Sequence, residues 1–224
     1  MKTIKPQGLE ILDIELEKDL LAKNRNLARE NRKRLDGLKI LAVDVMGSIG
    51  SGKTSLIKAL LRRLNMGESV AVIAGDLTTA IDGERIEEEG ARVIQVNTGK
   101  ECHLDANLVR RAMARMKLED VKILFVENVG NLICPGEFPL GTHKRLVVVS
   151  VTEGPYMIMK HPYIFREADV IVLNKVDLAK AMKVSASQLE RDARTINPRA
   201  PFIKINALKG TGISSVIEAL GLKG

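Results

Sequence analysis

Residues 39–55 read KILAVDVMGSIGSGKTS, and this stretch decides the fold. An apolar run leads into a glycine-rich turn, and an amphipathic stretch over residues 55–64 leads out of it. Strand, turn and helix are the context in which the pattern G-x-x-x-x-G-K-S/T binds the phosphates of a nucleotide. Glycines allow successive backbone N–H groups to face a polyphosphate, and the helix that follows presents its positive end to the same anion. The sequence therefore predicts a nucleotide site here.

The residues of this P-loop have separate roles in the predicted site. Lys53 is expected to reach the β- and γ-phosphate oxygens, and the Thr54 hydroxyl is expected to bind Mg²⁺. The expected nucleotide-binding set of the loop is Gly47, Ser48, Ile49, Gly50, Ser51, Gly52, Lys53, Thr54 and Ser55.

The composition indicates one large domain, or a domain with a short extension. The chain has 224 residues, of which 45% are apolar and 3% aromatic, so it can bury a large aliphatic core. No apolar run reaches about 18 residues and the first residues do not resemble a signal peptide, so we expect a cytoplasmic protein without a membrane partner. Two cysteines are too few for a disulfide framework. The net charge of +7 is partly concentrated in residues 23–34. Such a run is more often a solvated helix face, and nucleic acid is not expected as a partner.

Apolar, β-branched runs recur along the chain and alternate with helical patterns. The alternation predicts right-handed crossovers and an α/β fold: a doubly wound, mainly parallel sheet of about seven strands with helices on both faces. A stripe of leucines predicts a helix before the first strand, packed on its own domain. We therefore expect a helical extension over residues 1–37 and a nucleotide-binding domain over residues 38–224. The expected later strands are residues 69–74, 92–96, 121–126, 145–151, 169–173 and 201–205; the expected helices are 79–90, 105–117, 156–167, 185–196 and 212–221; the leucines are Leu9, Leu12, Leu16, Leu20, Leu27 and Leu35.

The loops that follow strands are the informative ones, because ligands of such sheets bind beyond the carboxyl ends of the strands. Glu127 ends one apolar strand; its carboxylate can hold Mg²⁺, and the Gly130 N–H can meet the γ-phosphate. Signalling GTPases usually carry Asp-x-x-Gly here, so direct or water-mediated contact of Glu127 with the metal stays open. Asp76 and Asp82 are further expected Mg²⁺ ligands, with a helix N-cap as the alternative role. The expected catalytic set is Lys53, Thr54, Asp76 and Glu127.

A second motif, Asn174-Lys175-Val176-Asp177, resembles the N-K-x-D loop with which P-loop GTPases recognise guanine. The Asp177 carboxylate can accept hydrogen bonds from the N1–H and 2-amino groups of guanine together, a donor pair that adenine lacks. Lys175 would lie against the base, and Asn174 would link neighbouring loops. A looser match over residues 206–209 indicates that the Ala207 N–H meets guanine O6. GTP and GDP are the expected ligands.

Cys102, His103 and Cys134 form a candidate metal site. All three lie in loops that follow strands, and thiolates with an imidazole suit Zn²⁺ or Ni²⁺. Three protein ligands cannot complete a structural zinc site, which takes four, so either water fills a position or two chains share ligands across a twofold axis. A structural role for each of these residues remains an alternative.

Three longer strings carry a family resemblance: NTGKECHLDA at 97–106, ENVGNLICP at 127–135 and LGTHKR at 140–145. They resemble the HypB family, the accessory GTPases that insert nickel into hydrogenase. The resemblance runs from about residue 38 to the C-terminus. It implies a homodimerising GTPase that binds Zn²⁺ or Ni²⁺ at Cys102, His103 and Cys134 and works with a nickel accessory protein and a hydrogenase large subunit. Some members carry an N-terminal cysteine motif or a His-rich tract, whereas the first 40 residues here contain neither Cys nor His.

Two other functions remain open from the sequence. A urease accessory GTPase is disfavoured, because that family separates its Cys and His by a proline whereas Cys102 and His103 are adjacent. The other is a regulatory nucleotide-binding module with a structural zinc. No water-orienting glutamine or arginine finger is evident, so hydrolysis of GTP to GDP and phosphate is expected to be slow. The γ-phosphate is expected to act on the metal site through residues 127–134.

Overall fold

The computed structural model describes residues 10–76, 81–99 and 101–222, with the side chains of 10–17, 81 and 82 outside the description. Within these ranges a single parallel sheet has the strand order β3-β2-β4-β1-β5-β6-β7. The predicted parallel α/β sheet is therefore confirmed. The strands are β1 (Leu41–Gly47), β2 (Val70–Asp76), β3 (Arg92–Asn97), β4 (Ile123–Glu127), β5 (Lys144–Ser150), β6 (Val170–Asn174) and β7 (Phe202–Lys204).

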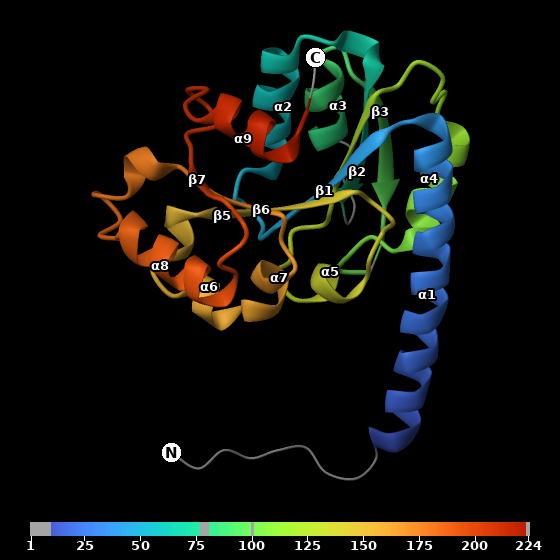
Figure 1. Cartoon of the computed structure of the whole chain (residues 1–224), viewed down its shortest axis with the longest axis horizontal. Coiled ribbons are helices and arrows are strands. Elements are labelled where there is room, and N and C mark those ends of the chain that lie inside the picture. The colour runs from blue at the N-terminus through green and yellow to red at the C-terminus, as the bar shows by residue number, and fades with distance from the viewer. Residues whose placement is uncertain (1–9, 77–80, 100, 223–224) are drawn as a thin grey trace.

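Helices cover both faces of the sheet (Figure 1). One face packs against α2, α3 and α9, and the other packs against α1 and α4 at one end and α6, α7 and α8 at the other. The helices are α1 (Glu10–Leu38), α2 (Lys53–Leu64), α3 (Ile81–Glu87), α4 (Ala106–Arg115), α5 (Cys134–Glu137), α6 (Met157–Lys160), α7 (Pro162–Arg166), α8 (Ala186–Ile196) and α9 (Ile213–Leu220), with short 3-10 turns η1 (Gly67–Ser69), η2 (Val151–Glu153) and η3 (Val176–Leu178).

Two local features differ from the sequence-based expectation. The single helix expected over 156–167 is divided into α6 and α7 at His161, because Pro162 has no N–H to continue the hydrogen-bond ladder. The short helix α5 was not expected, since its sequence, CPGE, is typical of a turn. Pro135 is tolerated there because it occupies the first turn of the helix, where N–H groups have no partner within the helix.

The N-terminal helix α1 packs against its own domain, as predicted, on the face that carries the leucine stripe. Leu35 of the stripe is fully buried, whereas Leu20, nearer the start of the helix, is 59% exposed. Asn24, Ala28 and Asn31 are also buried on this face. The two asparagines hydrogen-bond the backbone at the start of α4: Asn24 Oδ1 accepts from Ala106 N at 2.8 Å, and Asn31 Nδ2 donates to Ala106 O at 2.8 Å. A polar seam therefore anchors the helix.

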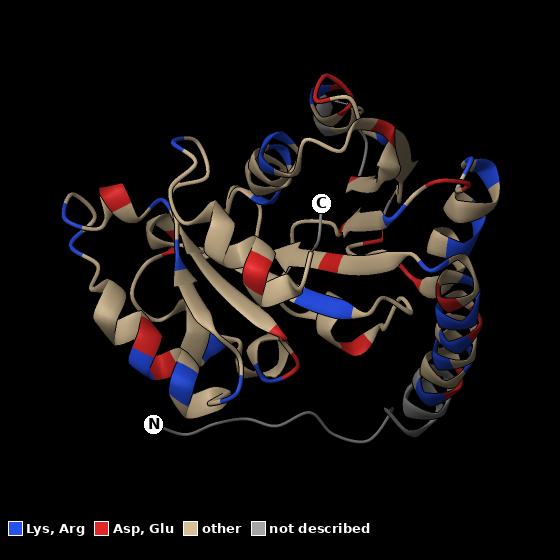
Figure 2. Ribbon diagram, turned by 45° about the horizontal axis from the view of Figure 1, so that its top comes forward, with Lys and Arg blue, Asp and Glu red and all other residues tan. Residues whose placement is uncertain are grey.

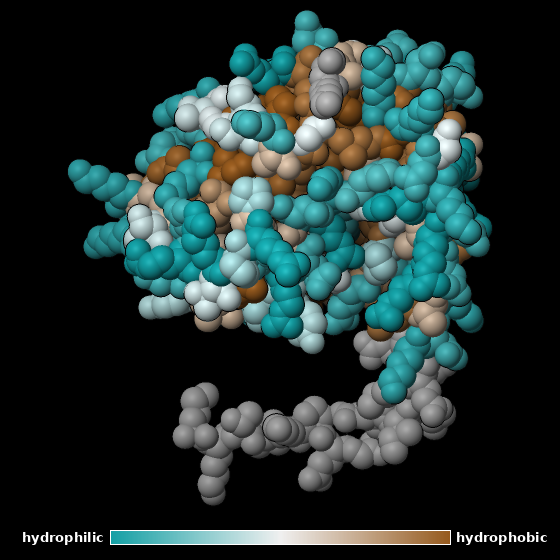
Figure 3. Space-filling model, viewed as in Figure 1, coloured by the Kyte–Doolittle hydropathy of each residue, from teal (hydrophilic) through white to brown (hydrophobic). Residues whose placement is uncertain are grey.

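The solvent side of α1 is strongly charged. Lys and Arg residues recur along the helix, with Asp and Glu among them (Figure 2), and the surface over it is hydrophilic in the space-filling view (Figure 3). The N-terminal half of α1 extends past the rest of the domain (Figure 1). No helix among the described residues is long and apolar enough to cross a membrane.

Candidate functional site

The P-loop connects β1 to α2 and has the geometry that phosphate binding requires. Gly52, the residue before α2, has φ +95°, and a Cβ there would lie 2.3 Å from Asn174 Nδ2. Only glycine fits this position without strain. Lys53 crosses the loop, and its Nζ donates to the carbonyl oxygens of Gly47 and Ser48 at 3.2 and 3.1 Å. The turn leads directly into the N-terminus of α2, which is the positive end of that helix.

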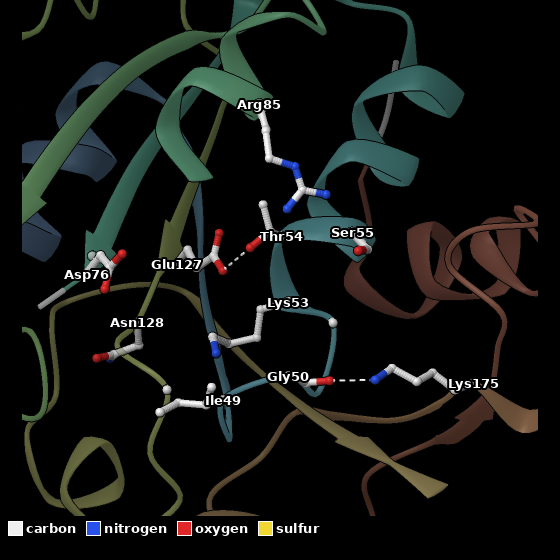
Figure 4. Close-up of a pocket in the computed structure, with 13 residues that line it drawn as sticks. Ile49, Gly50, Lys53, Thr54, Ser55, Asp76, Arg85, Glu127, Asn128 and Lys175 are labelled. Carbon is white, nitrogen blue, oxygen red and sulfur yellow. Dashed lines mark hydrogen bonds between the residues drawn. The ribbon is translucent and has the colours of Figure 1, made fainter. Parts of the chain in front are cut away.

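Three oxygen-bearing residues, one at the start of α2 and two at strand ends, line one cavity of about 400 Å³ beside this loop. Thr54, Asp76 at the end of β2 and Glu127 at the end of β4 all contribute to it (Figure 4). The Thr54 hydroxyl donates to Glu127 Oε1 at 2.7 Å. Hydroxyl and carboxylate oxygens are the donors that Mg²⁺ prefers, so these residues fit the predicted ion. The Asp82 side chain lies outside the described residues.

Arg85 on α3 is a residue that the sequence reasoning missed. It lines the same cavity, and its guanidinium points towards the Thr54 end (Figure 4). Packing of the neighbouring Ile86, which is fully buried, fixes α3 against the core. From the sequence, only Asp82 of residues 82–85 was expected to contribute to the site. Helical spacing alone does not show that Arg85 faces the cavity.

The other end of the cavity is formed by the N-K-x-D loop after β6. Lys175 Nζ donates to Gly50 O at 2.7 Å (Figure 4), and Asn174 Nδ2 donates to Ser51 O at 3.0 Å. Asn174 therefore links two loops, as expected. Its Oδ1 also accepts from Ala207 N at 3.1 Å, so a bond from Ala207 to guanine O6 would have to share or replace this contact. Lys209 Nζ lies 3.3 Å from Asp177 Oδ2.

The candidate metal ligands come together at the surface. The ligand atoms of Cys102, His103 and Cys134 all lie within 4.8 Å of one another. Cys102 Sγ is 3.0 Å from Cys134 Sγ and 3.7 Å from His103 Nδ1. The imidazole also packs on Phe138, with ring centroids 4.0 Å apart. Two thiols and an imidazole at this spacing fit a soft or borderline divalent ion.

The protonation of these ligands follows from their surroundings. Burial lowers the pKa of His103, and Glu101, Asp105 and Glu137 oppose this shift. A lower pKa keeps the imidazole neutral, which is the form that binds a metal. Burial and the neighbouring Cys102 thiol raise the pKa of Cys134. An incoming ion would therefore have to displace the thiol proton of Cys134.

Known proteins resemble this chain over most of its length. A family model described as the CobW/HypB/UreG nucleotide-binding domain matches residues 41–204. Over 205 residues the chain is 48% identical to the probable hydrogenase maturation factor HypB of Methanocaldococcus jannaschii, which covers 92% of this chain and 93% of that protein. The chain belongs to the HypB family.

Solved HypB structures have the same fold. The hydrogenase maturation factor HypB of Archaeoglobus fulgidus superimposes with a TM-score of 0.83 at 43% identity, over 89% of this chain and 98% of that one. HypB of Helicobacter pylori, solved in complex with nickel, gives a TM-score of 0.83 at 31% identity, over 88% of this chain and 93% of that one. The chain therefore shares with HypB a P-loop fold that supports nucleotide hydrolysis.

Proposed function

We propose that this chain is a GTP-hydrolysing metallochaperone that helps to deliver nickel during maturation of nickel–iron hydrogenase. One observation carries the proposal. The segment after β4 begins at Glu127 in the nucleotide cavity and reaches Cys134 in the thiol–imidazole cluster only seven positions later. Nucleotide and metal would therefore act on one short stretch of chain.

The nucleotide step uses the residues that line the cavity. The P-loop amides and Lys53 bind and orient the phosphates, while Asp177 and Lys175 hold the guanine. Mg²⁺ bound by Thr54, Glu127 and Asp76 would neutralise charge on the transferred phosphoryl group. No glutamine is among the described residues that line the cavity, which supports slow hydrolysis.

The metal step follows from the same loop. Contact between the γ-phosphate and the Gly130 N–H would reposition residues 127–134 and so move Cys134 relative to Cys102 and His103. By linkage, metal binding would alter nucleotide affinity to the same extent. The proposed protein is a cytoplasmic homodimer that pools its metal ligands. A nickel accessory protein is the proposed donor or acceptor of the metal, and a hydrogenase large subunit is the proposed recipient.

A titration of Ni²⁺ and of Zn²⁺, each with Mg²⁺–GDP and with a non-hydrolysable GTP analogue, tests the coupling. We expect the two nucleotide states to differ about tenfold in metal affinity. Cys102→Ala, His103→Ala and Cys134→Ala should each abolish the tight site, while His161→Ala, outside the cluster, serves as the matched control. Equal metal affinities in the two nucleotide states would refute the coupling. Light scattering of the same samples tests dimerisation.

Two assays separate the alternatives. Loading of apo-hydrogenase and apo-urease in a cell extract distinguishes hydrogenase from urease maturation, and we expect activity only towards apo-hydrogenase. Zinc that cannot be removed without unfolding, together with no release of phosphate from GTP, would instead identify a regulatory module with structural zinc.

A further inference from the structure

The side chain of Asn128 lies between the nucleotide cavity and the metal cluster. Asn128 follows Glu127 directly, lines the cavity and is fully buried (Figure 4). Its Oδ1 accepts from the backbone N–H of Leu104 at 3.0 Å and from that of Val129 at 3.1 Å. Leu104 is the residue after His103. One amide oxygen therefore joins the segment that meets the γ-phosphate to the segment that carries two of the three metal ligands.

A second contact joins the same segments through packing. The Leu104 side chain is fully buried and fills the space above Gly75, the residue before Asp76. A Cβ at Gly75 would lie 2.8 Å from Leu104 Cδ1 and 2.9 Å from the Glu127 carbonyl oxygen. Close-packed interiors transmit such displacements because they have no free volume to absorb them. A shift of either carboxylate-bearing strand end would therefore press on Leu104.

The other side of the Asn128 amide is held by β1. Its Nδ2 donates to Asp44 Oδ1 at 3.2 Å, and its backbone N–H donates to Val45 O at 3.0 Å. Asp44 is itself fully buried in the strand that leads into the P-loop. Because the amide is bonded on both sides, it has one orientation, with the oxygen towards Leu104.

We infer that Asn128, held by Asp44, is the positioning residue that transmits the nucleotide state to Cys102 and His103 through the Leu104 amide. This inference rests on the proposed function, since it names the route by which the γ-phosphate and the metal cluster affect one another. It adds a path to His103 that does not pass through residues 131–134. Asn128 itself contacts neither metal nor reacting atoms in this role.

The test measures Ni²⁺ affinity with GDP and with a non-hydrolysable GTP analogue in a set of variants. In Asn128→Ala the ratio of the two affinities should fall to within about twofold of one, because the link to Leu104 is lost. Above about pH 8, where the Asp44 carboxyl is ionised, Asn128→Asp should disrupt the pair by placing a second carboxylate against Asp44. Adding Asp44→Asn to that variant places an amide donor at position 44 opposite the new carboxylate acceptor at position 128. The double variant should therefore recover at least half of the logarithm of the original ratio of Ni²⁺ affinities.

Asn197→Ala is the matched control for the loss of a buried asparagine. The Asn197 amide donates to the carbonyl oxygens of Phe165, Arg166 and Ala168. None of these residues is in the metal cluster or in the described lining of the nucleotide cavity. This variant should lose stability but keep the ratio of Ni²⁺ affinities. A merely structural role for Asn128 would give the same result as the control and would overturn the inference.

The outcomes separate the two proposals. If the unmodified chain shows equal Ni²⁺ affinities in both nucleotide states, the proposed coupling fails and this route fails with it. If the unmodified chain shows a ratio that Asn128→Ala retains, only the route through Asn128 fails. Amide hydrogen exchange of the unmodified chain gives an independent measurement that needs no variant. The Leu104 amide should exchange at rates that differ at least about tenfold between the two states, and equal rates would overturn the route.

Discussion

Asp44 is an acidic residue that is fully buried in strand β1. Burial raises the pKa of its carboxyl group to about 7, while Arg145 and the hydrogen bond from Asn128 act in the opposite direction. Below about pH 4 the carboxyl is protonated in both the folded and the unfolded chain. Between about pH 4 and 7 only the folded chain holds this proton, so the folded state binds more protons than the unfolded state.

The stability of the protein should therefore fall as the pH rises through this window. From pH 5 to pH 8 we expect the free energy of unfolding to decrease by about 3 kcal/mol relative to that of Asp44→Asn, which does not titrate. Urea unfolding of both proteins at several pH values, at constant ionic strength, measures this difference. Two stability curves that run parallel over the whole range would contradict the prediction.

Arg85 should act on the terminal phosphate, since its charge enters the cavity at the Thr54 end. In Arg85→Ala we expect binding of a non-hydrolysable GTP analogue to weaken by about tenfold more than binding of GDP, and turnover to fall. Fluorescent nucleotide titration and phosphate release measure these effects. Arg199→Ala, on an exposed arginine before β7, is the control. An equal loss for both nucleotides would show that Arg85 does not contact the γ-phosphate.

The residues that the sequence could identify are those fixed by local backbone geometry. Lys53 and Thr54 are placed by the glycine turn that precedes them, and Lys175 by the short loop after its strand. Arg85 and Asn128 depend instead on how distant segments pack. Nothing in the sequence around Asn128 shows that the Leu104 amide lies against it, because that contact joins two separate crossovers of the sheet.

At the scale of the element, buried asparagine side chains hydrogen-bond α1 to the rest of the domain. Asn31 Nδ2 donates to Ala106 O and also to Leu140 O at 2.9 Å. Asn31→Ala should destabilise the protein by about 1 to 3 kcal/mol, because two buried carbonyl groups lose their donor. Urea unfolding measures the loss. Asn26→Ala, on the exposed side of the same helix, should change stability by less than about 0.5 kcal/mol.

The leucine stripe predicts which face of α1 packs, and the buried Leu35 agrees with it, but the polar contacts on that face were not predicted. Asn24 and Asn31 bond backbone groups at the start of α4 and in the 139–142 segment. Those backbone groups need partners only in the assembled sheet with its crossovers, so the role of the asparagines could not be assigned from the sequence.

At the scale of the whole molecule, the parallel sheet and its layering were predictable, whereas the strand order and the contacts between segments were not. Alternating apolar and helical patterns favour right-handed crossovers and a parallel sheet, but they do not specify which strands become neighbours. The convergence of Cys102, after β3, and Cys134, after β4, depends on how the two loops meet across β2, which lies between these strands in the sheet. The resemblance of three strings to a family supplied that pairing before the structure did.

Nucleotide should stabilise the assembled molecule, because its site is built from the ends of β1, β2, β4 and β6 and cannot persist in the unfolded chain. Mg²⁺–GDP at about one hundred times its dissociation constant should add about 2.7 kcal/mol. For a chain of this size the melting temperature should rise by about 5 to 10 °C. Differential scanning calorimetry with Mg²⁺–GDP and with Mg²⁺–ADP measures the shift. A similar rise with ADP would exclude guanine selectivity.

The polar seam under α1 has a consequence for shortened proteins. Asn24 accepts a hydrogen bond from Ala106 N and Asn31 donates one to Ala106 O, two residues beyond Leu104. Leu35 is buried in the same core cluster as Leu104. Deleting residues 1–38 would remove the hydrogen-bond partners of Ala106, three residues after His103, and would leave a cavity where Leu35 packs. Poor nickel retention by such a fragment would then result from loss of the contacts that support the metal cluster. It would not show that the deleted residues themselves bind nickel.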